Sequence, residues 1–86
     1  MTGHPGPVLY YRDRCHLCEE MAAFLFRHWP AVAARLRWVD VDGDAQLQAR
    51  YGEDVPVLLH DGEIVCRHTP DAAVLQRYFG PPTIPV

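Results

Sequence analysis

The spacing of apolar residues alternates between two patterns along the chain, and each change of spacing marks the start of a new secondary-structure element. Residues 8–11 form a short apolar and aromatic run that is typical of a β-strand. From residue 15 to residue 29, apolar side chains recur every three or four positions, which predicts an amphipathic helix that ends before Pro30. Residues 36–41 are again apolar at close spacing and predict a second strand.

The second half of the chain predicts a short helix, a hairpin and a last helix. Asp44 suits the cap of a helix over residues 45–51. Residues 55–60 and 63–67 predict two strands, because the Asp-Gly pair between them is a strong two-residue hairpin signal. Thr69 is expected to cap a last helix that starts at Pro70, since proline is favoured in the first turn of a helix.

This order of elements predicts the fold class. Two strands joined by a helix are expected to be parallel, with a right-handed crossover, and the hairpin adds an antiparallel pair. We therefore expect an α/β fold of order β-α-β-α-β-β-α, with a four-stranded mixed sheet and helices on both faces. The chain of 86 residues is read as a single domain, residues 1–86, in which segments 1–6 and 81–86 are loose ends.

Composition and charge narrow the classes of function. The formal net charge is -3, and all eight basic residues are arginine without a basic stripe, so a nucleic-acid partner is not expected. No apolar run reaches membrane-spanning length, and the first residues lack the pattern of a secretion signal, so we expect a cytoplasmic protein without a membrane partner. At this size a monomer is the simplest expectation. Three cysteines in a reducing compartment favour chemistry or metal binding over a structural disulfide framework.

The pair Cys15 and Cys18 carries the candidate chemistry. Two thiols at this spacing can close a small disulfide ring, and they lie where a strand passes into a helix. The unpaired N–H groups of a helix N-terminus favour a thiolate, which is the nucleophile in disulfide exchange. Cys15 is therefore the expected nucleophile, and Cys18, about one turn inside, is expected to resolve the mixed disulfide. The neighbours Arg14 and His16 favour the thiolate, whereas nearby carboxylates oppose it.

The chain resembles the glutaredoxin form of the thioredoxin fold over nearly its whole length. The resemblance rests on the sequence Cys-His-Leu-Cys after the first strand, on Val55-Pro56 at the start of the third strand, and on the hairpin that follows. It is most similar to bacterial glutaredoxin-like proteins that carry this Cys-His-Leu-Cys motif. The resemblance implies that Pro56 is cis and that Val55 presents its main chain to an incoming partner.

The resemblance also implies an activity and a set of binding residues. It implies a thiol–disulfide oxidoreductase that reduces protein or glutathione mixed disulfides, with electrons from glutathione or a reductase and no tightly bound cofactor. Typical glutaredoxins have Cys-Pro-Tyr-Cys and a glycine-rich segment after the hairpin, which this chain replaces with residues 66–71. The expected substrate-binding residues, beside the catalytic pair, are Arg14, His16, Leu17, Val55, Pro56, Thr69 and Asp71.

Two other classes of function stay open at this point. Cys15 and Cys18, with His16, Cys66 or a partner chain, could hold a metal ion or an iron–sulfur cluster. Alternatively, the domain could be a non-catalytic adaptor that binds a peptide along the Val55-Pro56 segment. The default reading of Cys66 is a small buried residue. The spacing of His4, His28 and His60 does not suggest metal ligands, and each is read as a surface histidine. Trp38 is read as a core or partly covered residue.

Overall fold

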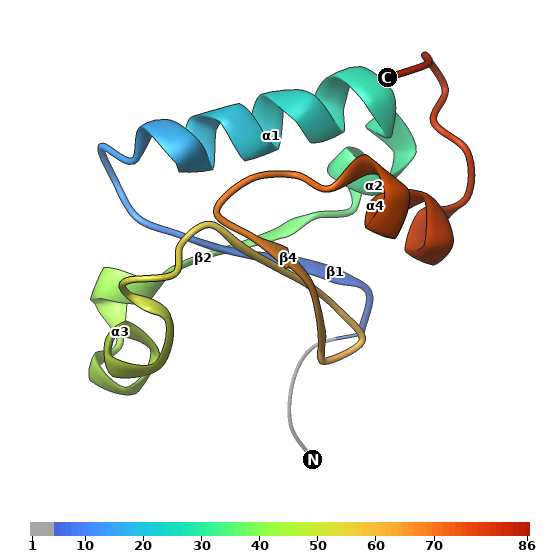
Figure 1. Cartoon of the computed structure of the whole chain (residues 1–86). Coiled ribbons are helices and arrows are strands. Elements are labelled where there is room, and N and C mark those ends of the chain that lie inside the picture. The colour runs from blue at the N-terminus through green and yellow to red at the C-terminus, as the bar shows by residue number, and fades with distance from the viewer. Residues whose placement is uncertain (1–4) are drawn as a thin grey trace.

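The computed structural model describes residues 5–86, and Figure 1 shows how their helices and strands are arranged. Along the chain the elements are β1 (Pro7–Tyr11), α1 (His16–His28), α2 (Pro30–Ala34), β2 (Arg37–Asp40), the 3-10 helix η1 (Val41–Gly43), α3 (Ala45–Tyr51), β3 (Val57–His60), β4 (Glu63–Arg67) and α4 (Ala72–Phe79).

The four strands form one mixed sheet in the order β2-β1-β3-β4. Strand β1 runs parallel to β2, with Leu9 opposite Trp38, and antiparallel to β3, with Leu9 opposite Leu58. Strands β3 and β4 form the hairpin expected from the Asp-Gly turn, with a register shift between Leu58 and Leu59. This topology confirms the predicted α/β class with a parallel first pair and an antiparallel hairpin.

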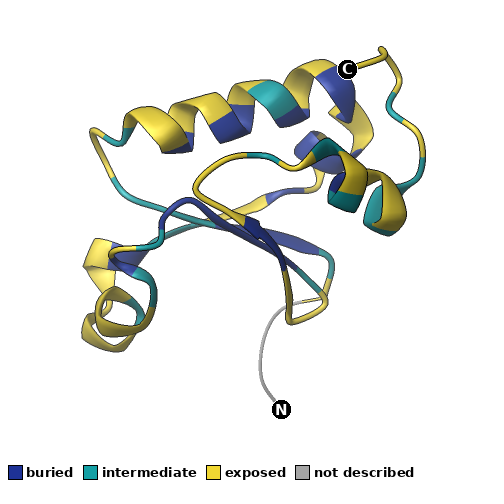
Figure 2. Ribbon diagram, viewed as in Figure 1, coloured by how far each residue is buried: buried dark blue, intermediate teal, exposed yellow. Residues whose placement is uncertain are grey.

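The main core lies between the sheet and the helices α1, α2 and α4, which share one face (Figure 1). Along α1 the buried positions follow the helical period, and Figure 2 shows them as a dark stripe toward the sheet. Leu9 and Leu58 supply the sheet side of this core, and Met21, Leu25 and Leu75 are fully buried on the helix side. Burial of each such side chain contributes about 1.5–3 kcal/mol, so this layer fixes α1 on the sheet.

The opposite face of the sheet is covered by α3, so helices lie on both faces as predicted. Val8, Val57 and Leu59 form its buried cluster. Tyr10 stacks on Tyr51 of α3 with ring centroids 4.6 Å apart, and burial raises the pKa of Tyr10 above its ordinary value. The alternation of Val8 and Leu9 between the two faces follows from the period of a strand.

Two strand boundaries differ from the sequence prediction. The second strand begins at Arg37 and ends at Asp40, because the Asp40 carboxylate accepts a hydrogen bond from the Asp42 N–H and turns the chain into η1. The third strand begins at Val57, because the main chain of Val55 and Pro56 lies outside the β1–β3 register.

The start of the last helix is also different. Asp71 caps α4 by accepting a hydrogen bond from the Val74 N–H, so the expectation that Thr69 caps a helix beginning at Pro70 is wrong. The cause is the preceding turn, in which His68 has a φ of 69° and the Thr69 N–H is bonded to the Arg67 carbonyl. Thr69 therefore remains in the connection between β4 and α4.

The C-terminal segment returns to the end of α1, although residues 81–86 were expected to be loose. The Thr83 N–H donates to the His28 carbonyl, and a ring nitrogen of His28 lies 2.8 Å from the Ile84 carbonyl. The Trp29 Nε1–H donates to the Gly80 carbonyl at 2.9 Å. His28 is consequently buried, which corrects its reading as a surface residue.

At the other end, residues 1–4 of the expected loose leader lie outside the described residues. The Gly6 N–H donates to the carboxylate of Asp61 at 2.6 Å, which joins this end to the β3–β4 turn. Across residues 5–86, each helix falls short of the length and apolar character that crossing a membrane requires.

Candidate functional site

The site is built around Cys15 and Cys18 at the N-terminus of α1. The two residues are joined by a disulfide, and their Cα atoms lie 5.1 Å apart. Arg14 has a φ of 58°, which turns the chain out of β1, and Cys15 then takes the extended conformation of a helix cap. Its Sγ accepts a hydrogen bond from the Cys18 N–H at 3.1 Å. The pair is thus fixed by the local main chain.

The two sulfurs have different environments. Cys15 is partly exposed, whereas Cys18 is 4% exposed and packs with Val41 and Val55 in a buried cluster. When the disulfide is reduced, the Cys18 N–H and the helix N-terminus favour negative charge on the Cys15 sulfur. An outside disulfide can reach Cys15 first, and Cys18 is held one turn away to attack the product. This asymmetry is what the sequence predicted for the two thiols.

The Val55-Pro56 segment borders the same buried cluster. The peptide bond between the two residues is cis, as the resemblance implied. The Pro56 carbonyl accepts the His68 N–H at 2.8 Å, which ties this segment to the turn before α4. Within residues 5–86 the main chain of Val55 makes no main-chain hydrogen bond.

The neighbouring loops are joined by charge pairs. Asp54 lies 3.5 Å from the Arg67 guanidinium and 3.7 Å from the His68 ring. Thr69 is exposed in the connection to α4, and the carboxylate of Asp71 is engaged by the Val74 N–H. Asp71 is therefore a helix cap in this structure.

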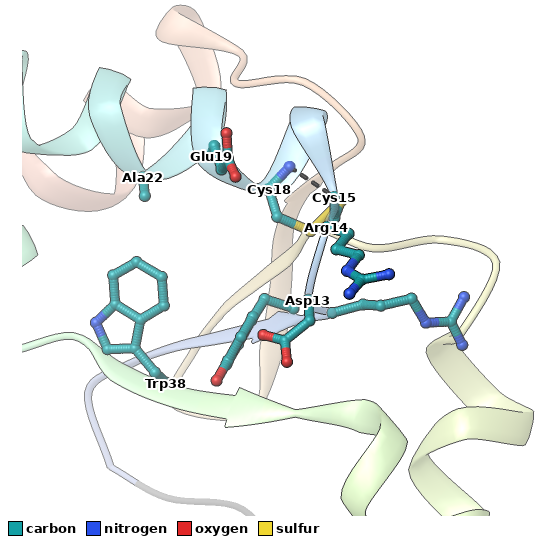
Figure 3. A pocket seen from close by; sticks show the side chains of 9 residues that line it. Asp13, Arg14, Cys15, Cys18, Glu19, Ala22 and Trp38 are labelled. Atoms are coloured by element: carbon teal, nitrogen blue, oxygen red, sulfur yellow. Dashed lines mark hydrogen bonds between the residues drawn. A yellow bond between two sulfur atoms is a disulfide. The ribbon is translucent and has the colours of Figure 1, made fainter.

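A pocket of about 340 Å³ opens beside the disulfide on the side of β2 (Figure 3). We call it the Trp38 pocket. It is lined by Tyr11, Arg12, Asp13, Arg14, Cys15, Cys18, Glu19, Ala22 and Trp38.

Of the predicted site residues, the Trp38 pocket brings together the two cysteines and Arg14. His16 and Leu17 lie on the exposed first turn of α1, where the His16 ring is 2.7 Å from the Glu20 carboxylate. The remaining four predicted residues do not line this pocket: Val55, Pro56, Thr69 and Asp71. Val55 nevertheless packs beside Cys18 in the buried cluster.

Arg12 at the end of β1 secures the loop that leads to Cys15. Its guanidinium lies 3.0 Å from the Asp42 carboxylate and donates to the Gly52 carbonyl, also at 3.0 Å. Hydrogen bonds from Arg12 first, and from Gln48 second, lower the pKa of Asp42 below its ordinary value. The charge of Arg12 is therefore paired with that of Asp42.

Sequence reasoning did not identify Trp38 as part of the site. Its spacing of two from buried Leu36 places it on the face that α1 covers, and that signal was present in the sequence. What the sequence did not show is that β2 is an edge strand, where Trp38 is 44% exposed. Tyr11 also lines the pocket and meets Trp38 edge to face, with ring centroids 5.6 Å apart.

The third cysteine, Cys66, is not part of the disulfide and lies away from the Trp38 pocket. Cys66 is a buried free thiol in the main core, which agrees with its default reading, and burial raises its pKa. Among residues 5–86, no group of three or more His, Cys, Asp and Glu side chains is placed to hold a metal ion.

Comparisons with known proteins agree with this geometry. Residues 8–80 match the family model described as Glutaredoxin-like domain (DUF836). The crystal structure of target protein XcR50 from X. campestris is 35% identical, covers 85% of this chain and 93% of its own, and superposes with a TM-score of 0.69. The solution structure of protein Ne2328 from Nitrosomonas europaea is 30% identical, covers 91% of this chain and 95% of its own, and has a TM-score of 0.68. A search of curated proteins found no match. The family match and these neighbours confirm the predicted thioredoxin-like fold.

Proposed function

This chain belongs to the family of glutaredoxin-like domains, and from that premise we propose that it is a thiol–disulfide oxidoreductase that reduces protein or glutathione mixed disulfides. The observation that carries the proposal is the asymmetric pair at the start of α1. Cys15 is partly exposed at the helix cap, and its partner Cys18 is buried one turn away. This arrangement suits a nucleophile that an outside disulfide reaches first and a resolving thiol that attacks it afterwards.

The reaction proceeds by two exchanges. The Cys15 thiolate attacks one sulfur of the partner disulfide, forms a mixed disulfide, and releases the other sulfur as a thiolate that takes up a proton from water. The Cys18 thiol loses its proton to solvent and attacks the Cys15 sulfur, which forms the Cys15–Cys18 disulfide and releases the second partner thiolate. Two electrons pass from the dithiol to the partner. An external thiol such as glutathione, or a reductase, then returns two electrons to the domain.

The Val55-Pro56 segment supports binding of an extended partner. Val55 packs with Cys18, and its main chain makes no main-chain hydrogen bond within residues 5–86. We propose that a peptide pairs with these main-chain groups while its sulfur reaches Cys15. Glutathione is itself a short peptide and can use the same groups. Arg14 and Thr69 lie in the two loops that flank this segment and the dithiol, and we propose them as contacts for its charged ends.

Three cysteine variants test the proposal. We expect Cys15→Ser to abolish reduction of a peptide mixed disulfide, and Cys18→Ser to accumulate a covalent adduct between Cys15 and the peptide, seen by mass spectrometry. Cys66→Ser is the matched control, because Cys66 lies in the core of the fold away from the pocket, and it should retain turnover. Full turnover by Cys15→Ser would contradict the proposal.

A reduction potential completes the test. The Cys15–Cys18 pair should titrate reversibly between dithiol and disulfide, and addition of glutathione should shift the population through mixed-disulfide formation. A pair that does not respond to glutathione, but is reduced by a reductase, would exclude glutathione as the electron donor and leave the thiol chemistry in place.

A further inference from the structure

The Trp38 pocket lies beside the reacting sulfurs and is separate from the Val55-Pro56 segment. Its lining comes from the loop between β1 and α1, from the first turns of α1, and from β2. Cys15 and Cys18 form part of its wall. A side chain of a residue neighbouring the partner's cysteine would therefore enter this pocket when the partner sulfur is bonded to Cys15.

The pocket has aromatic walls that the fold leaves uncovered. Trp38 lies on the edge strand β2, opposite Leu9 of the core, and stays partly exposed. Figure 3 shows Trp38 and Ala22 on one side of the pocket, with Cys18 and Glu19 beyond them. A partly exposed Trp next to a reactive group is typical of a recognition site, because Trp is enriched among the residues that dominate binding.

The charges around the pocket favour a cation. Asp13 and Glu19 contribute carboxylates to its lining, and neither has an ion-pair partner within residues 5–86. Arg12 is neutralised by Asp42. Arg14 is the remaining cation of the lining, so the two carboxylates of the lining outnumber it.

We propose that the Trp38 pocket binds the arginine side chain of a residue that neighbours the partner's disulfide-bonded cysteine. This inference rests on the proposed function and names its partner class, a disulfide-containing protein with arginine beside the cysteine. A guanidinium stacks on the Trp38 ring and is attracted by its π face, while its N–H groups reach the carboxylates of Asp13 and Glu19. The volume of about 340 Å³ is at the lower end of the range, about 300–1,000 Å³, of small-molecule pockets, which suits one long side chain.

A pair of isosteric peptides tests the inference through turnover. Each peptide carries one cysteine as a mixed disulfide with mercaptoethanol, flanked by arginine or by citrulline, which has the same shape and no charge. We expect kcat/KM for the arginine peptide to be about tenfold higher, which corresponds to about 1.4 kcal/mol of discrimination. The ratio of the two peptides is the readout, because changes at the thiols affect both equally.

Variants of the pocket should remove this preference. In Trp38→Leu, and in the double variant Asp13→Asn with Glu19→Gln, the ratio should fall toward one. The matched control is Phe26→Leu, which changes an aromatic side chain of α1 that is 54% exposed and outside the pocket, and it should keep the tenfold ratio. Equal rates for both peptides with the wild-type protein, or higher rates for a phenylalanine peptide, would overturn the inference while leaving the redox function intact.

A binding measurement keeps the two proposals distinguishable if no peptide is turned over. The oxidised protein is titrated with the thiol-free tripeptide amide Gly-Arg-Gly, and the indole N–H signal of Trp38 is followed by NMR. Trp29 is an internal reference, because its indole is buried and bonded to the Gly80 carbonyl. We expect a saturable shift of the Trp38 signal that the citrulline peptide and glutathione do not produce. A Trp38 signal that does not move with the arginine peptide would refute the pocket's assignment, whatever the redox activity.

Discussion

The Arg12 guanidinium and the Asp42 carboxylate, 30 residues apart in the chain, meet at 3.0 Å and join the loop before Cys15 to the segment that leads into α3. Arg12 also donates to the Gly52 carbonyl at the end of α3. The same loop carries Arg14, whose left-handed conformation sets the direction in which Cys15 enters α1. The ion pair therefore fixes the loop that carries Arg14 and leads into Cys15.

The ion pair predicts that the stability of the protein depends on pH through the titration of the Asp42 carboxyl group. Its pKa is lowered in the folded state by the Arg12 hydrogen bond, so its stabilising contribution is fully present above the ordinary carboxyl pKa. That contribution is lost progressively as the pH falls from about 4 and passes through the lowered pKa of Asp42. We expect the urea midpoint of the wild type to fall more steeply over this acid range than that of Asp42→Asn.

The control for this prediction is Asp44→Asn, because Asp44 caps α3 and asparagine is an equally good cap. It should retain the steep acid dependence. If Asp42→Asn follows the wild-type profile throughout the acid range, the ion pair does not contribute to stability.

The second prediction concerns Gly52, whose carbonyl accepts the Arg12 hydrogen bond. A Cβ at this position would overlap the Gln48 carbonyl and lie 3.0 Å from the Arg12 guanidinium. We expect Gly52→Ala to reduce the free energy of unfolding by about 1–3 kcal/mol, as overpacking does, and to displace Arg12. Gly43→Ala is the matched control, since a Cβ there meets nothing within 4 Å, and its effect should stay within about 0.5 kcal/mol. Equal urea midpoints for the two variants would refute the steric argument.

The sequence predicted those elements whose signals are local. The period of α1 and the Asp-Gly turn of the hairpin depend on neighbouring residues only, and both occur where expected. The position of the dithiol at the start of α1 follows from the same local pattern. By contrast, the cap of α4 depends on the turn at His68, and its φ of 69° is not visible in the residue types.

The parts that could not be predicted depend on contacts between distant segments. The exposure of Trp38 follows from the strand order, which places β2 at an edge, and the engagement of Arg12 follows from the position of α3. His28 is buried because the C-terminal segment returns to it, and a tail rich in proline gives no periodic signal for that return. In each case the sequence gives the residue type, but it does not show which distant segment the residue contacts.

The C-terminal segment supplies a third prediction. Trp29 is buried and donates its Nε1–H to the Gly80 carbonyl, which fixes the point where the chain leaves α4. We expect Trp29→Phe to reduce the free energy of unfolding in urea by about 1 kcal/mol from the lost hydrogen bond, with a further loss from the smaller ring. Hydrogen exchange of the Thr83 N–H, which bonds to the His28 carbonyl, should become faster. Phe26→Leu, on the exposed face of α1, should leave that exchange rate unchanged, and an unaltered Thr83 rate in Trp29→Phe would contradict the prediction.

The last prediction compares the thiols of Cys66 and Cys15, because they differ in solvent exposure and in how far their surroundings favour the thiolate. Burial raises the pKa of Cys66, so at neutral pH its thiolate fraction is smaller than that of an ordinary exposed thiol. Cys15 lies at the helix N-terminus with its sulfur accepting the Cys18 N–H, and both features favour the anion.

When the reduced protein is treated briefly with iodoacetamide at neutral pH, peptide mass spectrometry should find Cys15 alkylated well before Cys66. Unfolding in urea is the control, since it should bring Cys66 to the rate of an ordinary thiol. Labelling of Cys66 as fast as Cys15 in the folded protein would show that the core around β4 opens readily, and the raised pKa would then no longer protect this thiol.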